Sequence, residues 1–450
     1  MFRFKILHRD TKTKARVGEI HTPHGVIKTP AFVPVGTQAS VKSLTPEEIK
    51  ETGTDIFFVN TYHMYLRPGI AVVEKFGGLH QFMGWNGPII TDSGGFQVFS
   101  LSRGRGAEVV DENFDPSSIS VRRLHGPDPK KKVNPDKILS TSRATESLVR
   151  ITEEGVEFRS HWDGSKHLFT PEKAMEWQWK LGSDIHIAFD DCTPYGLSHE
   201  KAKKSLQRTH AWAKRSLDEH RKLSLRDPAK RGEAISRKGI AASKTPRNDE
   251  GWPYQALYGS VQGSVYEDLR KESATFISSL DFDGMAIGGV SVGETKKEMV
   301  NVLDWVVPYL PQEKPRHLLG VGEIDDIFAL VERGMDTFDC VQPTRLARVG
   351  RVLIWNNPII QLSNNPINKW EMDITKKEYA EDVGPLDISC KCYTCTHFSR
   401  AYVHHLFHVR ELLGYRLASI HNLWFMHRLM YLIRDAIGNG TLLDLKKKWI

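Results

Sequence analysis

Eight short apolar runs recur between residues 31 and 341, and most of them end in a polar residue or a glycine. The segments between the runs often carry apolar residues at helical spacing, as in residues 266–280, 295–310 and 323–333. Eight buried strands that alternate with helices are typical of an α/β fold, the (β/α)8 TIM barrel. The predicted strands cover residues 31–36, 55–60, 88–92, 184–190, 255–262, 284–289, 317–322 and 337–341.

Polar residues and a glycine gather at the carboxyl ends of these predicted strands. In a (β/α)8 barrel the carboxyl ends of all strands meet at one mouth, which is where active sites lie. Polar residues also follow strands in other α/β proteins, but here they come from six separate strands. The candidates are Asn60, Asp92, Asp190, Gln262, Gly289 and Asp339.

Asp339 lies where a buried apolar strand reaches the surface, and Arg345 and Arg348 follow a few residues later. A carboxylate beside two guanidinium groups suits a nucleophile that acts on a phosphate-bearing substrate. The alternative is an aspartate that begins a turn before Pro343, with both arginines solvated. The local pattern leaves these two interpretations about equal.

Two further acids have neighbours that suit a planar ligand. Asp92 precedes two glycines, which permit close backbone approach, and Phe96, which offers a stacking face. Asp190 is suited to bind adjacent N–H donors of a nitrogen heterocycle, and Gln262 with the backbone of residues 288–290 would complete such a pocket. Asp92 and Asp339 together could share covalent catalysis and proton transfer. Paired acids fit a glycoside hydrolase or a divalent-metal site equally well.

Three of the five cysteines, Cys390, Cys392 and Cys395, lie within six residues. This odd total and close spacing disfavour a disulfide framework and predict a tetrahedral zinc ion. A fourth ligand must come from elsewhere, and spacing leaves five candidates open. A closed site of this kind would be structural. The candidates are His397, His404, His405, His408 and His421, the last at the start of a predicted helix over residues 423–437.

The chain of 450 residues has room for one barrel and an appendage. We predict a catalytic TIM-barrel domain over residues 1–385, begun by antiparallel strands, and a zinc-binding subdomain with C-terminal helices over residues 386–450. Residues from about 103 to 145 and from about 221 to 252 interrupt the strand–helix alternation and are interpreted as surface insertions.

The net charge of +7 weakly indicates an anionic partner. The sequence holds no apolar stretch of membrane-spanning length, and its first residues alternate like a strand instead of a signal peptide. We therefore expect a cytoplasmic protein with no membrane partner.

These motifs, in this order, resemble the tRNA-guanine transglycosylases, also called queuine tRNA-ribosyltransferases. The likeness covers nearly the whole chain outside the two insertions. It rests on residues 29–37, 60–63, 261–264, 287–289 and 338–345, on the motifs around Asp92 and Asp190, and on the cysteine cluster. The resemblance implies a (β/α)8 barrel with a zinc subdomain, a homodimer, and exchange of the wobble guanine in tRNAs with a GUN anticodon.

The resemblance also implies a role for each matching residue. Asp339 would attack the ribose C1′ and expel guanine, and Asp92 would be the general acid and base. The guanine-like edge would be read by Asp190, Gln262 and Gly289, with Phe96 stacked on the base and Val290 beside it. Thr344, Arg345 and Arg348 would contact the anticodon loop, and His421 would be the fourth zinc ligand.

The incoming base is expected to be 7-aminomethyl-7-deazaguanine (preQ1), because Cys192 and Val292 are similar to the smaller pocket of bacterial members of that family. An enzyme that inserts queuine is the alternative. Two other classes remain: a non-catalytic tRNA-binding accessory subunit, which would need neither Asp92 nor Asp339, and a metal-dependent barrel hydrolase that uses His63.

Overall fold

The computed structural model describes residues 2–97, 149–160, 162–193, 195–225, 254–291, 293–355 and 370–450. The first predicted insertion, most of the second, and Val292 lie outside the described residues. Residues 221–225 of the second insertion belong to the end of helix α7 (His199–Ser224) and the residue after it.

The eight predicted strands form one parallel sheet in the order β4-β14-β13-β12-β11-β10-β6-β5. The sheet closes into a barrel because Val35 forms a parallel bridge with Phe58, and the Gly36 N–H donates to the Phe58 carbonyl at 2.7 Å. The predicted barrel is therefore confirmed. Its strands are β4 (Ala31–Pro34), β5 (Phe57–Val59), β6 (Ile89–Thr91), β10 (Ile185–Ile187), β11 (Ala256–Val261), β12 (Gly284–Ile287), β13 (Arg316–Leu318) and β14 (Thr337–Cys340).

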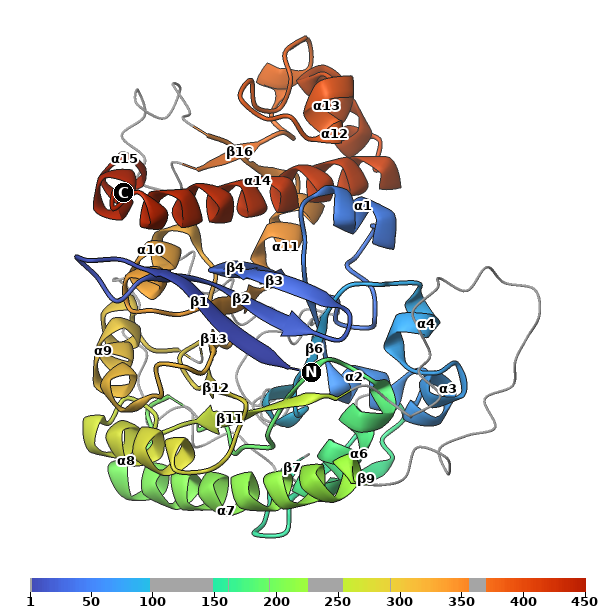
Figure 1. The fold of residues 1–450 in the computed structure, drawn as a ribbon. Helices are drawn as coiled ribbons and strands as arrows, with labels where there is room; N and C mark the ends of the chain where they lie inside the picture. Colours follow the sequence, from blue (N-terminus) through green and yellow to red (C-terminus); the bar gives the residue numbers. More distant parts are fainter. Residues whose placement is uncertain are drawn as a thin grey trace, which may run out of the picture.

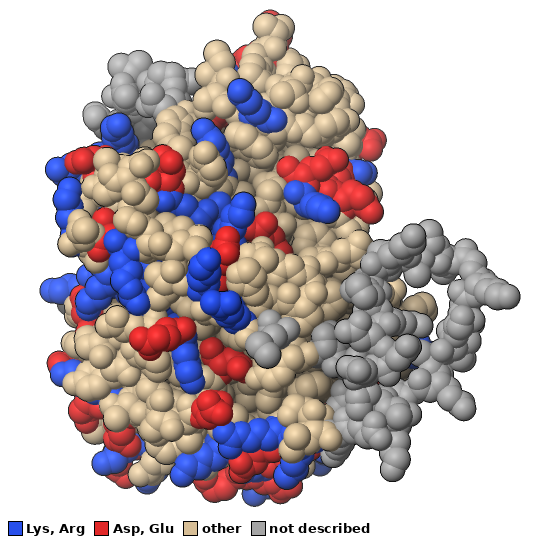
Figure 2. Space-filling model, in the orientation of Figure 1, with Lys and Arg blue, Asp and Glu red and all other residues tan. Residues whose placement is uncertain are grey.

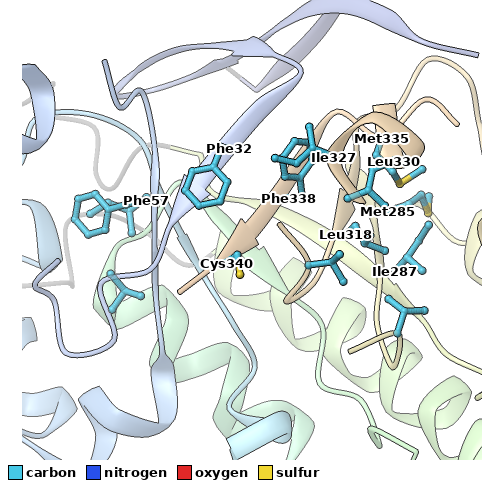
Figure 3. Packing of buried hydrophobic residues seen from close by; sticks show 14 of the residues in the cluster. Phe32, Phe57, Met285, Ile287, Leu318, Ile327, Leu330, Met335, Phe338 and Cys340 are labelled. Carbon is cyan, nitrogen blue, oxygen red and sulfur yellow. The ribbon is translucent and has the colours of Figure 1, made fainter. Parts of the chain in front are cut away.

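Alternate residues of each strand face two different cores. In β14, Phe338 points outward into the cluster that contains Ile327 and Leu330 of helix α10 (Ile324–Glu332), as Figure 3 shows. The opposite face of the sheet fills the barrel interior, with Val33 and Phe58 among its side chains. Because side chains of a strand alternate between faces, Asp339 takes an inward position next to Phe338.

The helices pack outside the barrel, as Figure 1 shows. The predicted helices at residues 266–280, 295–310 and 323–333 are confirmed as α8, α9 with a 3-10 turn after it, and α10. Helix α9 begins after Thr295 because Thr295 and Glu298 form a reciprocal capping box. Apart from α10, the helices around the strands are α1 (Pro46–Glu51), α2 (Thr61–Leu66), α3 (Ile70–Lys75), α4 (Leu79–Met83), α6 (Pro171–Leu181), α7, α8 (Glu267–Ser278), α9 (Lys296–Val306) and α11 (Gln342–Arg348).

The predicted antiparallel N-terminal strands are β1 (Arg3–Arg9), β2 (Arg16–Thr22) and β3 (Gly25–Thr29). This sheet covers the amino end of the barrel. Side chains of the sheet and its turns hydrogen-bond to two aspartates that stand just before barrel strands. The Arg16 guanidinium donates to Asp336, just before β14, and His24 bonds to Asp184, just before β10. On the face that carries this sheet, acidic and basic side chains are interspersed (Figure 2). The carboxyl ends of the strands open on the opposite side.

A second three-stranded antiparallel sheet, which the sequence reading missed, lies between β6 and α6 in the chain. It consists of β7 (Val149–Ile151), β8 (Val156–Arg159) and β9 (Lys166–Phe169). Phe169 of β9 lies beside Gly94, just after the carboxyl end of β6, so this sheet lies on the mouth side of the barrel. No described helix is both long and apolar enough to span a lipid bilayer.

The C-terminal part differs from the prediction at two helices. Arg410 has a φ of 59° and separates the two helices, so the predicted helix over residues 399–413 ends early. The next helix begins at Leu412, not at residue 423, which places His421 well inside it. The elements are β15 (Arg351–Leu353), β16 (Glu371–Asp373), α12 (Tyr393–His397), α13 (Arg400–His408), α14 (Leu412–Gly438) and α15 (Leu442–Trp449).

Candidate active site and metal cluster

Asp339 reaches the mouth of the barrel with one carboxylate oxygen held and the other available. Its Oδ1 accepts hydrogen bonds from the Gly320 N–H at 2.9 Å and from His317 Nε2 at 3.1 Å. Among the described residues, none hydrogen-bonds to Oδ2. The Asp339 side chain is 11% exposed. One oxygen therefore fixes the orientation of Asp339, and the other can react.

His317 was not among the predicted site residues, although it positions the candidate nucleophile, Asp339. Its Nδ1 lies 2.9 Å from the Thr337 hydroxyl and its ring stacks on Phe58 inside the barrel. If the hydroxyl donates to Nδ1, then Nε2 carries the proton that is donated to Asp339. The available signal was a histidine at the start of an otherwise apolar predicted strand.

Asp92 is a buried acid at the carboxyl end of β6. Its carboxylate accepts hydrogen bonds from Asn60 Nδ2 at 2.6 Å, the Thr61 N–H at 2.8 Å and Gln97 Nε2 at 2.8 Å. Burial raises the pKa of Asp92 to about 6, although these three hydrogen bonds oppose the rise; the charge of Asp339 adds to it. A carboxyl with this pKa can hold or release a proton near neutral pH.

Asp190 and Gln262 lie together, as the sequence predicted for one pocket. Asp190 Oδ2 accepts hydrogen bonds from Gln262 Nε2 at 2.5 Å and from the Ser260 hydroxyl at 2.7 Å. Burial raises the pKa of Asp190. The Gln262 Oε1 atom is buried, and no group among the described residues hydrogen-bonds to it. An acceptor left unsatisfied in this way favours a ligand that supplies an N–H donor.

Gly289 packs directly against Gln262. It has a φ of +63°, and a Cβ at this position would lie 2.5 Å from Gln262 Oε1. A Cβ on Gly288 would lie 2.5 Å from Gln262 Nε2. Both positions therefore require glycine if Gln262 is to keep its place beside Asp190.

Arg270 holds these glycines in place, a role that was not predicted from the sequence. Its guanidinium is fully buried and donates to the carbonyls of Gly288 at 2.8 Å, Gly289 at 2.9 Å and Val261 at 3.1 Å. Arg270 thus ties the carboxyl ends of β11 and β12 together behind the pocket.

The remaining predicted base-pocket residues lie close to these groups. Cys192 is buried and packs against Phe96, which is half-buried. Burial raises the pKa of the Cys192 thiol, and the charges of Asp190 and Asp191 add to the rise. Val290 is fully buried next to Gly289. Glu294, which the sequence reading did not single out, is buried as well.

The three predicted tRNA contacts lie on α11, directly after the strand that carries Asp339. Arg345 and Arg348 are half-buried. Thr344 is 4% exposed, and its hydroxyl donates to the Val341 carbonyl at 3.1 Å. The two arginines therefore offer the accessible charge of this helix.

Cys390, Cys392, Cys395 and His421 form a compact cluster whose ligand atoms all lie within 4.8 Å of one another. His421 Nδ1 faces the three sulfur atoms, at 3.2 Å from Cys395 Sγ, and Nε2 donates to the Leu353 carbonyl at 2.6 Å. Such a backbone bond fixes the tautomer of a metal-binding histidine. The four residues therefore fit a bound metal ion.

The described residues contain one other grouping of metal-binding side chains, which consists of His24, His80 and Asp184 at the amino end of the barrel. His63 belongs to neither group. A metal-dependent hydrolase built on His63 thus gains no support from the described part of the chain.

Comparison with known proteins gives one consistent result. The family model described as queuine tRNA-ribosyltransferase matches residues 10–117 and 130–450. The chain is 44% identical over 447 residues to the queuine tRNA-ribosyltransferase of Thermoanaerobacter pseudethanolicus, covering 99% of this chain and 96% of that protein. It is 44% identical over 447 residues to the protein of the same name from Roseiflexus sp. strain RS-1, covering 99% of this chain and 98% of that protein.

Proposed function

Because the chain belongs to the queuine tRNA-ribosyltransferase family, we propose that it replaces the wobble guanine of GUN-anticodon tRNAs with preQ1 through a covalent bond between Asp339 and ribose. The family consists of pentosyltransferases that act on tRNA. The observation that carries the proposed covalent exchange is the pair of acids at the mouth. Asp339 has one oxygen fixed by His317 and Gly320, and Asp92 has a pKa of about 6.

Recognition begins when the target nucleotide leaves the base stack, since a stacked base cannot reach the mouth of a barrel. Asp190 accepts the N1–H and the 2-amino group of guanine, and these donors stabilise its charged form against burial. Gln262 Oε1, which has no partner in the described structure, accepts a further N–H of the base. Gly289 leaves room for that amide, and Phe96 stacks on the ring.

In the first half-reaction, Asp339 Oδ2 forms a bond to the ribose C1′ while the bond between C1′ and guanine N9 breaks. The electron pair of the broken bond goes to guanine, which takes a proton from Asp92. His317 and Gly320 keep Oδ1 in place, so Oδ2 stays directed at C1′.

In the second half-reaction, the incoming base gives its N9 proton to the Asp92 carboxylate. Its N9 then bonds to C1′, and the bond between C1′ and Asp339 breaks with its electrons returning to the carboxylate. Asp92 ends with the proton with which it began, so exchange consumes no net proton. Arg345 and Arg348 hold the phosphates of the anticodon loop throughout, and Thr344 supports them within α11.

The choice of preQ1 rests on space and charge beside Cys192. Cys192 is 6% exposed and packs against Phe96, which favours the smaller base over queuine with its added ring. The thiol lies in the field of Asp190, Asp191 and Glu294. These carboxylates suit the cationic aminomethyl group of preQ1.

The test is exchange of labelled guanine into an unmodified GUN-anticodon tRNA, with preQ1 or queuine as the competing base. We expect label at the wobble position, blocked by preQ1 but not by queuine. Blocking by queuine would identify a queuine-inserting enzyme. No label with folded, metal-loaded protein would indicate a tRNA-binding accessory subunit.

We further propose that the cysteine cluster binds one structural zinc ion, because three thiolates and one imidazole are the ligands of closed zinc sites. The ion would hold α14 against Leu353, and Asn422, the next residue of α14, donates to the Pro343 carbonyl of α11 at 2.9 Å. Zinc would thereby stabilise the helix that follows Asp339. The domain boundary near residue 386 and the homodimer remain predictions.

Replacing His421 by alanine is expected to lower the zinc content from one ion per chain to none and the Tm by more than roughly 10 °C, because metal binding and folding are coupled. Elemental analysis and calorimetry measure both quantities. The control is His397→Ala, since His397 is exposed and bonds to the Tyr393 carbonyl at 2.8 Å. Full zinc content in the His421 variant would contradict the assigned ligand.

A further inference from the structure

A pocket of about 280 Å³ lies where the end of α2 meets the hairpin between β8 and β9. Its volume is sufficient for one nucleobase. Nothing in the reaction described above uses it. The residues that carry the argument among its lining are Tyr65, Arg67, Ser160, Trp162, Ser165 and His167.

Helix α2 connects this pocket to the catalytic acids. The N–H of Thr61, the first residue of α2, donates to Asp92 Oδ1 at 2.8 Å. Arg67 follows the last residue of the same helix and lines the pocket. Six helical residues span about 9 Å, so the pocket lies within reach of a nucleotide that adjoins the one being exchanged.

An aromatic cluster fixes the hairpin to this helix. The ring of Tyr65 lies 5.0 Å from Phe169 and 4.3 Å from Trp177. Tyr62 lies 5.4 Å from Phe158, which connects β8 to the same helix. These contacts between aromatic rings hold the pocket walls in place before any ligand binds.

Two stacking groups form the open side of the pocket. The Trp162 side chain is 50% exposed, which is unusual for a tryptophan on a folded surface. The Arg67 guanidinium carbon lies 3.9 Å from the centroid of that ring. Arg67 is exposed and forms no ion pair with a described carboxylate. Indole and guanidinium planes are the surfaces on which unpaired RNA bases stack.

Polar groups and charge complete the surface. His167 lies between the Tyr65 hydroxyl, at 3.0 Å, and the Ser165 hydroxyl, at 2.7 Å. Along the hairpin, Arg159 and Lys166 balance Glu157 and Asp163, and Arg67 adds one further cation, so the local charge is positive by one. The surface therefore combines stacking planes, hydrogen-bonding groups and excess positive charge.

We propose that this pocket binds a single-stranded RNA nucleotide next to the exchanged one, with its base stacked on Trp162 and Arg67 and its phosphate near Arg67 and Lys166. The inference rests on the proposed function in one respect: the RNA is the tRNA substrate. The pocket would hold the anticodon loop open while the target nucleotide occupies the mouth.

The test measures the affinity of a labelled anticodon stem-loop for wild-type protein and for Trp162→Ala. Loss of one stacked base is expected to weaken binding about 5- to 100-fold. The KM for tRNA should rise similarly, while the KM for the free base and kcat at saturating tRNA stay unchanged. Trp162→Phe should retain most of the affinity, which separates lost stacking from a folding defect.

The matched control is Tyr431→Ala. Tyr431 is 54% exposed on α14 and has Arg428 over its ring at 5.1 Å, so it is an equivalent aromatic–cation pair elsewhere on the surface. This variant should bind the stem-loop like the wild type.

A second measurement locates the nucleotide. Stem-loops with one abasic nucleotide at each loop position should show one position, adjoining the exchanged one, whose abasic form weakens wild-type binding but not binding by Trp162→Ala. Wild-type affinity in Trp162→Ala, or additive losses at every position, would overturn the inference. If stem-loop binding depends on Trp162 but no guanine is exchanged, the pocket stands and the proposed reaction fails.

Discussion

Asparagine in place of Asp339 is expected to lower the rate of guanine exchange by at least about 10⁴-fold while leaving the affinity for tRNA unchanged. The amide oxygen can still accept the hydrogen bonds from His317 and Gly320, so the side chain keeps its position. What it loses is the reactive oxygen, because an amide nitrogen replaces Oδ2. Single-turnover exchange and tRNA binding, measured on the same preparation, separate the two effects.

The proposed covalent intermediate would provide a second readout of this variant. Wild-type protein incubated with tRNA and then denatured should carry an RNA adduct that the Asp339→Asn protein lacks. Asp281→Asn is the control, since Asp281 is a carboxylate with 84% side-chain exposure that lies between α8 and β12, at the amino end of the barrel. An Asp339→Asn protein with wild-type exchange would exclude Asp339 as the nucleophile.

Asparagine in place of Asp92 is expected to lower exchange by about 10²- to 10⁴-fold, which is the usual contribution of a positioned acid or base. The wild-type pH profile gives the sharper test, because the proposed reaction uses Asp92 in both protonation states. Release of guanine requires the protonated carboxyl, so kcat/KM for tRNA should fall above about pH 6. Entry of the new base requires the carboxylate, so kcat/KM for the base should fall at low pH.

The pH profile of kcat/KM for the incoming base should have its inflection at a lower pH than the profile of kcat/KM for tRNA. Once Asp339 is esterified it carries no charge, and that charge is one cause of the raised pKa of Asp92. Asn60→Ala should move both inflections upward, since the Asn60 hydrogen bond lowers the pKa of Asp92. If both kcat/KM values are independent of pH between about 5 and 8, Asp92 does not transfer the proton.

The barrel could be predicted from sequence because each strand is a short apolar run that is buried on both faces, and such runs are visible without knowledge of tertiary contacts. The acids at the strand ends were visible for the same reason, since Asp92, Asp190 and Asp339 each interrupt an apolar run. Their roles came from the family resemblance. Paired acids by themselves left several chemistries open.

The groups that position these acids could not be found in the sequence. His317 is 22 residues from Asp339 and meets it only because β13 and β14 pair in register. Arg270 lies in a helix whose apolar pattern is ordinary, and only the fold shows that its guanidinium is buried against strand carbonyls. Hydrogen bonds between distant segments leave no periodic signal.

The N-terminal sheet that covers the amino end of the barrel has a consequence for the order of events. In the proposed reaction, a base enters and leaves through the mouth that the tRNA covers, because this sheet covers the other end of the barrel. In that reaction, departing guanine and arriving base would use the same passage in turn, while the ribose is bound to Asp339. Free guanine should thus compete with the incoming base for the attached intermediate, and a slow opening of the RNA-covered mouth would limit turnover for every base.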